Sequence, residues 1–84
     1  RDLSFANLEG ADLQGADLRG ARLRYVNLQQ AKLQNANLEA ADLTRANMKG
    51  VLAEGVNLTD ITTLRTICSK SLSVIHGIRC SQEP

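Results

Sequence analysis

The chain has 84 residues, a formal net charge of +1 and only one Phe and one Tyr. This length suffices for one domain, and ten basic against nine acidic side chains drive neither polyanion nor polycation binding. The sequence contains no run of roughly twenty apolar residues and no charged-then-apolar signal segment, so no membrane span is expected. Any targeting sequence has been removed or lay upstream.

Residues 6–60 consist of eleven five-residue units in which Ala-Asp-Leu or Ala-Asn-Leu recurs without an insertion, and residues 1–5 form an imperfect twelfth. A period of five fits neither the helix nor the strand, because either would scatter the leucines over every face. A solenoid keeps the central leucine of each unit, and the small residue two positions before it, in one narrow channel. The sequence therefore predicts a solenoid.

The tandem A(D/N)LXX motif resembles the pentapeptide-repeat family over about residues 1–60. The resemblance implies an all-β solenoid, namely a right-handed quadrilateral β-helix with four units, and so twenty residues, in each coil. Twelve units would make about three coils.

The outward residues provide a check on four sides rather than three. Stacked residues would be twenty apart in a four-sided coil and fifteen apart in a three-sided one. An offset of twenty aligns amides with amides, opposite charges with each other, and a cation with two aromatic rings, whereas fifteen places Asp2 over Asp17. The columns at an offset of twenty are Asn7, Asn27 and Asn47; Asp2, Arg22 and Asp42; and Phe5, Tyr25 and Arg45.

Arg1 occupies a position that Ala or Val fills in every later unit up to residue 60, and there is no initiator Met. We interpret the chain as the C-terminal part of a longer protein. Its first coil would then expose unpaired backbone groups able to recruit another chain, and a dimer through this end is compatible with the sequence.

The repeat weakens in residues 51–55, where Ala53 replaces the central leucine and Leu52 takes an outward site. We expect this unit to be distorted and Leu52 to be covered by later residues. The period stops after Asp60, which is predicted to cap a helix. The apolar face of that helix would comprise Ile61, Leu64, Ile67 and Cys68.

Ser71 is predicted to cap a second short helix. That helix would carry Leu72, Ile75 and Ile78. One or two such helices would close the open end of the solenoid, as terminal caps do in repeat proteins. The predicted domains are a β-helix at residues 1–60 and a helical C-terminal cap and tail at residues 61–84.

Cys68 and Cys80 lie in this predicted cap. In one continuous helix they would be about 18 Å apart, beyond the ~7 Å limit for a disulfide, whereas a helical hairpin could bring them together. A Cys68–Cys80 disulfide is the prediction, and two buried thiols are the alternative. A disulfide would place the protein in an oxidising compartment, and free thiols would favour the cytosol.

Repeats that end in a disulfide-linked helical cap are similar to small pentapeptide-repeat proteins of cyanobacteria and the plant thylakoid lumen. This resemblance implies the thylakoid lumen, with the bacterial periplasm as the alternative.

The sequence gives little support to catalysis or metal binding. No glycine elbow or acid motif accompanies His76 and the serines near it, and the spacing of Cys68, His76 and Cys80 forms no recognised zinc motif. The serines are Ser69, Ser71 and Ser73. Asn57 begins a formal glycosylation sequon, but an outward column over Asp17 and Asn37 accounts for it. We expect no enzyme activity, catalytic residue, metal or cofactor.

The predicted function is a non-enzymatic structural or protein-interaction module whose partner is unknown. Phe5, Tyr25 and Arg45 form the candidate contact patch, because exposed aromatic rings beside arginine are typical of contact anchors. The alternative is that this column only stiffens one face.

Two further readings come from the family resemblance. Some pentapeptide-repeat proteins protect DNA gyrase by imitating the DNA duplex, but three coils at ~4.8 Å make a rod only about 14 Å long. Residues 1–60 also hold eight acids and seven bases, so neither DNA mimicry nor nucleic-acid binding is expected. A regulatory scaffold in the lumen or periplasm is the other reading.

Overall fold

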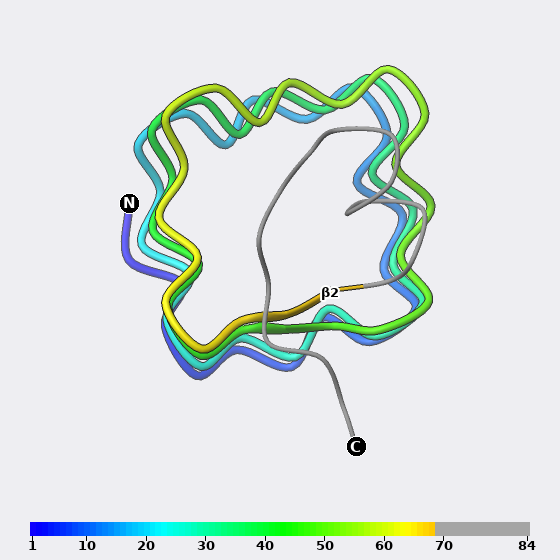
Figure 1. Ribbon diagram of the computed structural model, residues 1–84. Helices are drawn as coiled ribbons and strands as arrows, with labels where there is room; N and C mark the ends of the chain where they lie inside the picture. Colours follow the sequence, from blue (N-terminus) through cyan, green and yellow to red (C-terminus); the bar gives the residue numbers. More distant parts are fainter. Residues whose placement is uncertain (69–84) are drawn as a thin grey trace.

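The computed structural model describes residues 1–68, which wind into a four-sided coil with each turn stacked on the one before (Figure 1). Parallel bridges join residues that are twenty apart, from Asp2 with Arg22 to Asp42 with Thr62. The predicted offset of twenty is therefore confirmed. At this offset, residues 1–68 make three coils and part of a fourth.

Regular strands are short because each side of the coil is only one unit long. The two strands in the described part of the chain are β1 (Asn47–Met48) and β2 (Ile67–Cys68). They pair in parallel, with Asn47 opposite Ile67 and Met48 opposite Cys68. On the other sides a single residue, the second of its unit, bridges to the next coil.

A tight turn follows the centre of each unit. In a typical case the N–H of Ala31 donates to the carbonyl of Leu28 at 3.0 Å. The fifth residue has a positive φ in all thirteen described units, which at this point of a turn is typical of type II. Glycine supplies this conformation in five units, and other residues adopt it in eight. These left-handed residues form the corners of the coil.

The Asp or Asn at the second position holds the backbone that leads into each turn. Its side-chain oxygen accepts a hydrogen bond from the N–H two residues later, at 3.0 to 3.2 Å. The residues that do so are Asp2, Asn7, Asp12, Asp17, Asn27, Asn37, Asp42, Asn47 and Asn57. Asx turns of this kind explain why the motif requires Asp or Asn. The expected amide ladder is present between Asn27 and Asn7, whose Nδ2 and Oδ1 are 3.3 Å apart.

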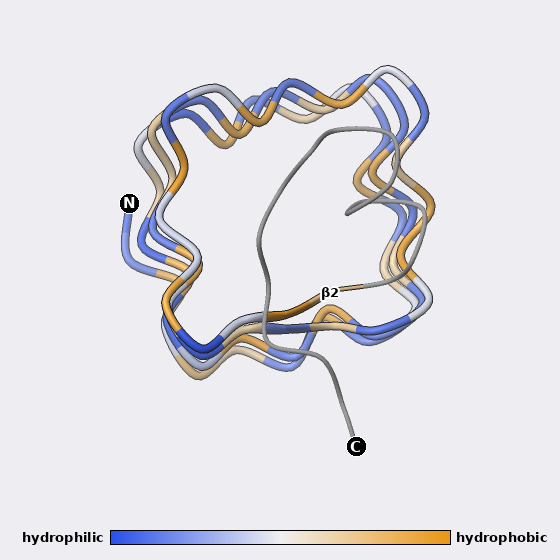
Figure 2. Ribbon diagram, in the orientation of Figure 1, coloured by the Kyte–Doolittle hydropathy of each residue, from blue (hydrophilic) through white to orange (hydrophobic). Residues whose placement is uncertain are grey.

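The channel inside the coil is filled by alternating large and small apolar side chains, as predicted. Apolar and polar stretches alternate along each side of the coil (Figure 2). The central leucines of the second coil and the first one of the third are completely buried, namely Leu23, Leu28, Leu33, Leu38 and Leu43. Those of the first coil are less protected, because Leu3, Leu8 and Leu13 are only partly buried. The core therefore lies within the stacked middle of the molecule.

Residues 61–68 continue the coil, so the helix expected to begin after Asp60 is wrong for this segment. Thr62 and Ile67 donate their N–H groups to the carbonyls of Ala41 and Ala46, both at 3.0 Å. Leu64, expected on the apolar face of a helix, is 66% exposed. The carbonyls of the preceding coil offer partners at every side, and they hold this segment despite its changed side chains. The rest of the expected cap, residues 69–84, lies outside the described residues.

The weak unit at residues 51–55 is regular, contrary to expectation. Leu52 bridges to Lys32, and its carbonyl accepts the N–H of Leu33 at 2.8 Å. Val51 and Ala53 point inward and are buried, whereas Leu52 remains 48% exposed. The backbone register therefore tolerates a unit in which the central leucine is missing.

Candidate interaction face

One corner of the coil carries large side chains in every coil. Phe5, Tyr25, Arg45 and Arg65 occupy its left-handed positions, and we call them the Tyr25 corner. The Phe5 and Tyr25 rings are stacked, with centroids 4.9 Å apart and planes 4° from parallel. The guanidinium carbon of Arg45 lies 5.7 Å from the centroid of Tyr25. The predicted stacking of two aromatic rings and a cation in one column is therefore confirmed.

The backbone holds each member of this corner in place. The N–H groups of Phe5, Tyr25 and Arg45 donate to carbonyls of the next coil at 2.8 to 2.9 Å. The rings nevertheless remain accessible, because Phe5 is 74% and Tyr25 44% exposed. The corner therefore presents aromatic surface from a fixed backbone.

The Tyr25 corner differs from the other three in its residues. Each of the other corners has glycine in the first coil, and their columns are Gly10, Gln30 and Gly50; Gly15, Asn35 and Gly55; and Gly20, Ala40 and Asp60. A positive φ costs a residue with a side chain about 1–2 kcal/mol relative to its usual conformation. The Tyr25 corner accepts this cost in all four coils, and backbone strain of this kind concentrates at functional sites.

Charged side chains lie on the side of the coil next to this corner. Arg24 and Asp42 form an ion pair, with 3.8 Å between Nε and Oδ2. The Thr44 hydroxyl holds the pKa of Asp42 below its ordinary value, with smaller effects from the Thr44 N–H and nearby arginines. The N–H of Ser4 is the main cause of the lowered pKa of Asp2. Both carboxylates are therefore ionised at neutral pH.

These residues line an open depression of about 600 Å³ beside the aromatic rings. Its lining comprises Asp2, Ser4, Phe5, Arg22, Arg24, Tyr25 and Asp42. Aromatic surface, guanidinium groups and carboxylates thus meet in one place. Such a combination can hold a polar segment of another molecule and offers stacking as well as ion pairing.

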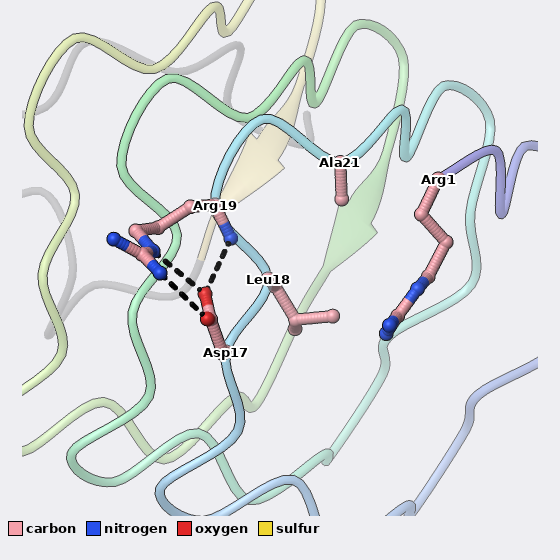
Figure 3. A pocket seen from close by; sticks show the side chains of 5 residues that line it. All are labelled: Arg1, Asp17, Leu18, Arg19 and Ala21. Carbon is pink, nitrogen blue, oxygen red and sulfur yellow. Dashed lines mark hydrogen bonds and ion pairs between the residues drawn. The ribbon is translucent and has the colours of Figure 1, made fainter.

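A second depression, of about 410 Å³, lies at the N-terminal end of the coil (Figure 3). Leu18 and Ala21 line it together with Arg1, Asp17 and Arg19. Asp17 and Arg19 point toward each other, and the Arg19 Nε and Nη2 atoms each lie 2.9 Å from a carboxylate oxygen. Hydrogen bonding and ion pairing to Arg19 lower the pKa of Asp17 to about 2. Because this carboxylate is already engaged, the depression offers no general base.

The remaining predicted site residues lie at or beyond the end of the described region. Cys68 is half-buried at the end of β2 and packs against the core. Cys80 and His76 lie outside the described residues, as do the serines near His76, so the disulfide remains a prediction. Within residues 1–68 there is no group of three His, Cys, Asp or Glu side chains that could hold a metal ion. The same residues include no helix with the length and hydropathy of a membrane span.

Sequence reasoning placed Arg22 in a column with Asp2 and Asp42 but missed Arg24 and Arg65. Arg22 and Arg24 line the depression, and Arg65 extends the Tyr25 corner into the fourth coil. The signal that could have found Arg65 was the offset of twenty, continued past residue 60.

Comparison with known proteins agrees with the architecture described above. The pattern of pentapeptide repeats matches residues 2–39 and 21–60. The chain belongs to the pentapeptide-repeat family. Members of this family fold as right-handed quadrilateral β-helices, which agrees with the twenty-residue coil. No curated protein matches the sequence.

Several solved structures of pentapeptide-repeat proteins are similar to this chain. HetL, involved in heterocyst differentiation regulation in the cyanobacterium Nostoc sp. strain PCC 7120, is 33% identical over 80% of this chain, with a TM-score of 0.60. The chain spans 40% of HetL. A protein from the Arabidopsis thaliana thylakoid lumen is also 33% identical, over 80% of this chain and 53% of its own length, with a TM-score of 0.39. Rfr23 from Cyanothece 51142 is 33% identical over 82% of this chain and 56% of its own length, with a TM-score of 0.41.

Proposed function

We propose that this pentapeptide-repeat protein is a non-enzymatic protein-interaction module whose contact surface is the Tyr25 corner with its adjoining depression. The observation that carries the proposal is the left-handed Phe5–Tyr25–Arg45 column. Three other corners of the same coil begin with glycine, so the architecture does not require large side chains there. Strain retained beside exposed aromatic surface is typical of a binding surface.

The plain alternative is that the stack only stiffens the coil. A stacked aromatic pair contributes about 0.5–1.5 kcal/mol beyond its buried area, which is less than the conformational cost of two left-handed residues at about 1–2 kcal/mol each. Stiffening therefore brings little net stability.

The experiment is quantitative affinity capture from an extract of the source organism, with the wild-type chain and a Tyr25→Ala/Arg45→Ala variant as baits. Ala40 adopts a positive φ in the native coil, so alanine is compatible with a corner position. We expect the variant to lose specific proteins that the wild type retains. The matched control is Gln30→Ala/Asn35→Ala, which changes two other corners.

Circular dichroism and thermal unfolding establish that both variants retain the coil. Identical protein profiles for the wild type and the folded Tyr25→Ala/Arg45→Ala variant would contradict an interaction role for this corner. Equal losses in the control variant would show that the captured proteins recognise the coil in general and not this corner.

Mimicry of the DNA duplex is less well supported than a protein-interaction role. The described residues hold eight acidic and eight basic side chains, so they lack the excess negative charge that such mimicry needs. The Tyr25 corner itself is cationic, with Arg45 and Arg65 at its left-handed positions.

We also propose an oxidising compartment for the protein, with the thylakoid lumen favoured over the periplasm. The support for an oxidising compartment is the pair of cysteines in the sequence, both of which lie after the recognised repeats. The preference for the lumen rests on the resemblance to small pentapeptide-repeat proteins. Free thiols at Cys68 and Cys80 would instead favour the cytosol.

A further inference from the structure

The Tyr25 corner has an aromatic end and a cationic end. The rings of Phe5 and Tyr25 lie in the first two coils, and Arg45 and Arg65 follow in the third and fourth. The two rings stack on each other, and both remain partly exposed, Phe5 at 74% and Tyr25 at 44%. Two chemically different contacts are therefore available along one line down the coil.

The cationic end has more charge than its neighbours neutralise. Among the described residues, Arg45 interacts with the Tyr25 ring, and neither Arg45 nor Arg65 has a carboxylate within ion-pair distance. Arg24 pairs with Asp42, whereas Arg22 has no such pair in this part of the chain. A guanidinium group without a partner favours a carboxylate that can accept two parallel hydrogen bonds.

The spacing along the corner matches that of an extended peptide. Neighbouring coils lie ~4.8 Å apart, so the backbone positions of Phe5 and Arg65, three coils apart, are separated by about 14 Å. An extended chain rises ~3.4 Å per residue, and every second side chain points to the same side. Residues i, i+2 and i+4 of such a chain therefore span about 14 Å on one face.

We propose that the Tyr25 corner binds an extended acidic segment of another protein. The segment carries an aromatic side chain at position i, which packs against the exposed parts of the Phe5 and Tyr25 rings, and carboxylates at i+2 and i+4, which pair with the arginines. The proposal rests on the proposed function and adds to it the chemical class of the partner.

A nucleic acid could supply planar rings and negative charge as well, but this face suits it less. Asp2 and Asp42 stand beside the rings, and hydrogen bonds lower the pKa values of both carboxylates, which therefore stay ionised at neutral pH. A polyphosphate backbone would meet these charges, whereas a short acidic segment with alternating side chains can avoid them. The experiment must therefore distinguish binding of an acidic peptide from binding of a nucleic acid.

The test is a titration of the ¹⁵N-labelled chain with blocked peptides, followed by NMR. The probe contains the core Trp-Ser-Asp-Ser-Asp, and the matched control replaces both Asp residues by Lys. We expect the acidic peptide to shift the amide signals of Phe5, Tyr25 and Arg45 and to bind at least tenfold more tightly than the Lys peptide. Added salt should weaken the binding, because exposed charge pairs are screened.

Two variants locate the contacts without disturbing the backbone. Arg65→Gln should weaken binding about two- to fivefold, as expected for a solvent-exposed ion pair. Phe5→Gly should weaken it about two- to tenfold, because it removes aromatic contact surface. Gln30 and Gly10 occupy equivalent left-handed positions in the native coil, so both substitutions are compatible with folding. Lys32→Gln, on another side, is the control and should leave the affinity unchanged.

The outcomes distinguish the acidic-segment proposal from the general proposal of a protein-interaction role. Equal affinity for the acidic and Lys peptides, or acidic-peptide binding that Arg65→Gln does not weaken, would overturn the acidic-segment proposal. The interaction role would still stand if the Tyr25→Ala/Arg45→Ala variant lost its captured proteins. Tighter binding of an oligothymidine than of the acidic peptide, with the same dependence on Phe5 and Arg65, would replace the peptide partner with single-stranded nucleic acid.

Discussion

The fifth residue of each unit sets the direction of the chain at the corners. Gly20 and Gly55 both have a positive φ, but their surroundings differ. A Cβ at Gly20 would have no neighbour within 4 Å, whereas one at Gly55 would lie 2.3 Å from Oδ1 of Asn35. The two positions therefore separate the cost of the backbone conformation from the cost of crowding.

Substitution of these glycines by alanine should destabilise the coil to different extents. We expect Gly20→Ala to lower the free energy of unfolding by about 1 kcal/mol, from the left-handed conformation less the entropy of glycine in the unfolded chain. Gly55→Ala should cost slightly more, because the exposed Asn35 side chain must also rotate away. Urea denaturation followed by circular dichroism measures both. In an Asn35→Ala background the additional cost at Gly55 should disappear, and equal losses for the two single variants would contradict the crowding.

The sequence did not predict the left-handed backbone conformation of the corner residues. Glycine occupies only five of the thirteen described corner positions, and residues as large as Tyr25 occupy others, so no single residue type marks the corner. The Phe5–Tyr25–Arg45 column could be predicted, because stacking depends only on the offset between coils. The role of the Asp and Asn side chains could not, because their hydrogen bonds reach the backbone two residues later and leave no signal at a distance.

The carboxylate of Asp17 makes the stability of the protein dependent on pH. Its pKa is about 2 in the folded protein, against an ordinary value of 3.8. Since the folded value is depressed, ionised Asp17 stabilises the fold above about pH 4, and this contribution is lost as the pH falls toward 2. The lowered pKa values of Asp2, Asp12 and Asp42 act in the same direction.

We therefore expect the free energy of unfolding to decrease between about pH 4 and pH 2 in urea denaturation experiments. Asp17→Asn should make this decrease smaller, because the amide cannot be titrated in that range. Asn37 accepts the N–H of Glu39 at 3.1 Å in the same column, so an amide also preserves the turn. An unchanged pH dependence in the Asp17→Asn variant would show that this carboxylate does not contribute.

At the scale of the element, one side of a coil is stabilised by its position in the stack. Leu13 and Leu33 occupy the same column, but Leu33 is completely buried between two coils, whereas Leu13 in the first coil is only partly buried. Identical side chains at equivalent points of the repeat therefore differ in how much apolar surface they remove from water.

Leu33→Ala should lower the free energy of unfolding by about 2–5 kcal/mol, the usual cost of a cavity in a packed core. Leu13→Ala should cost clearly less, because solvent and neighbouring atoms can fill the space at the open end. Chemical denaturation of both variants checks this difference. Equal losses would mean that the first coil is protected as well as the second.

The segment 61–68 shows where sequence reasoning about elements fails. Its leucine and isoleucines are spaced by three, which imitates the apolar stripe of a helix, and its centre is Thr63 in place of Leu. The structure extends the coil because backbone groups of residues 41–46 accept hydrogen bonds from any residue type. Thr66 then points inward, is completely buried and donates its hydroxyl to the carbonyl of Leu43.

At the scale of the whole molecule, the predicted Cys68–Cys80 disulfide would join β2 to the residues that follow. A bond that closes thirteen residues contributes nearly 3 kcal/mol in the loop-entropy model. We expect the intact mass, measured without reductant, to be lower by two hydrogen atoms than the mass after reduction. Both thiols should react with an alkylating reagent only after reduction. Two reactive thiols at the outset would remove the bond and the argument for an oxidising compartment.

The direct stacking of coils separates what the interior requires from what the surface requires. After insertion or loss of one unit, the central leucine of each later unit would still point into the channel. The packing of the interior would therefore be preserved. The same change would rotate every later residue by a quarter turn, and Tyr25 would no longer lie between Phe5 and Arg45. Only a change of a whole coil keeps each later side chain on its own face. Such a chain can gain or lose units without unfolding. Whether the change amounts to whole coils of four units then decides which side chains share a face.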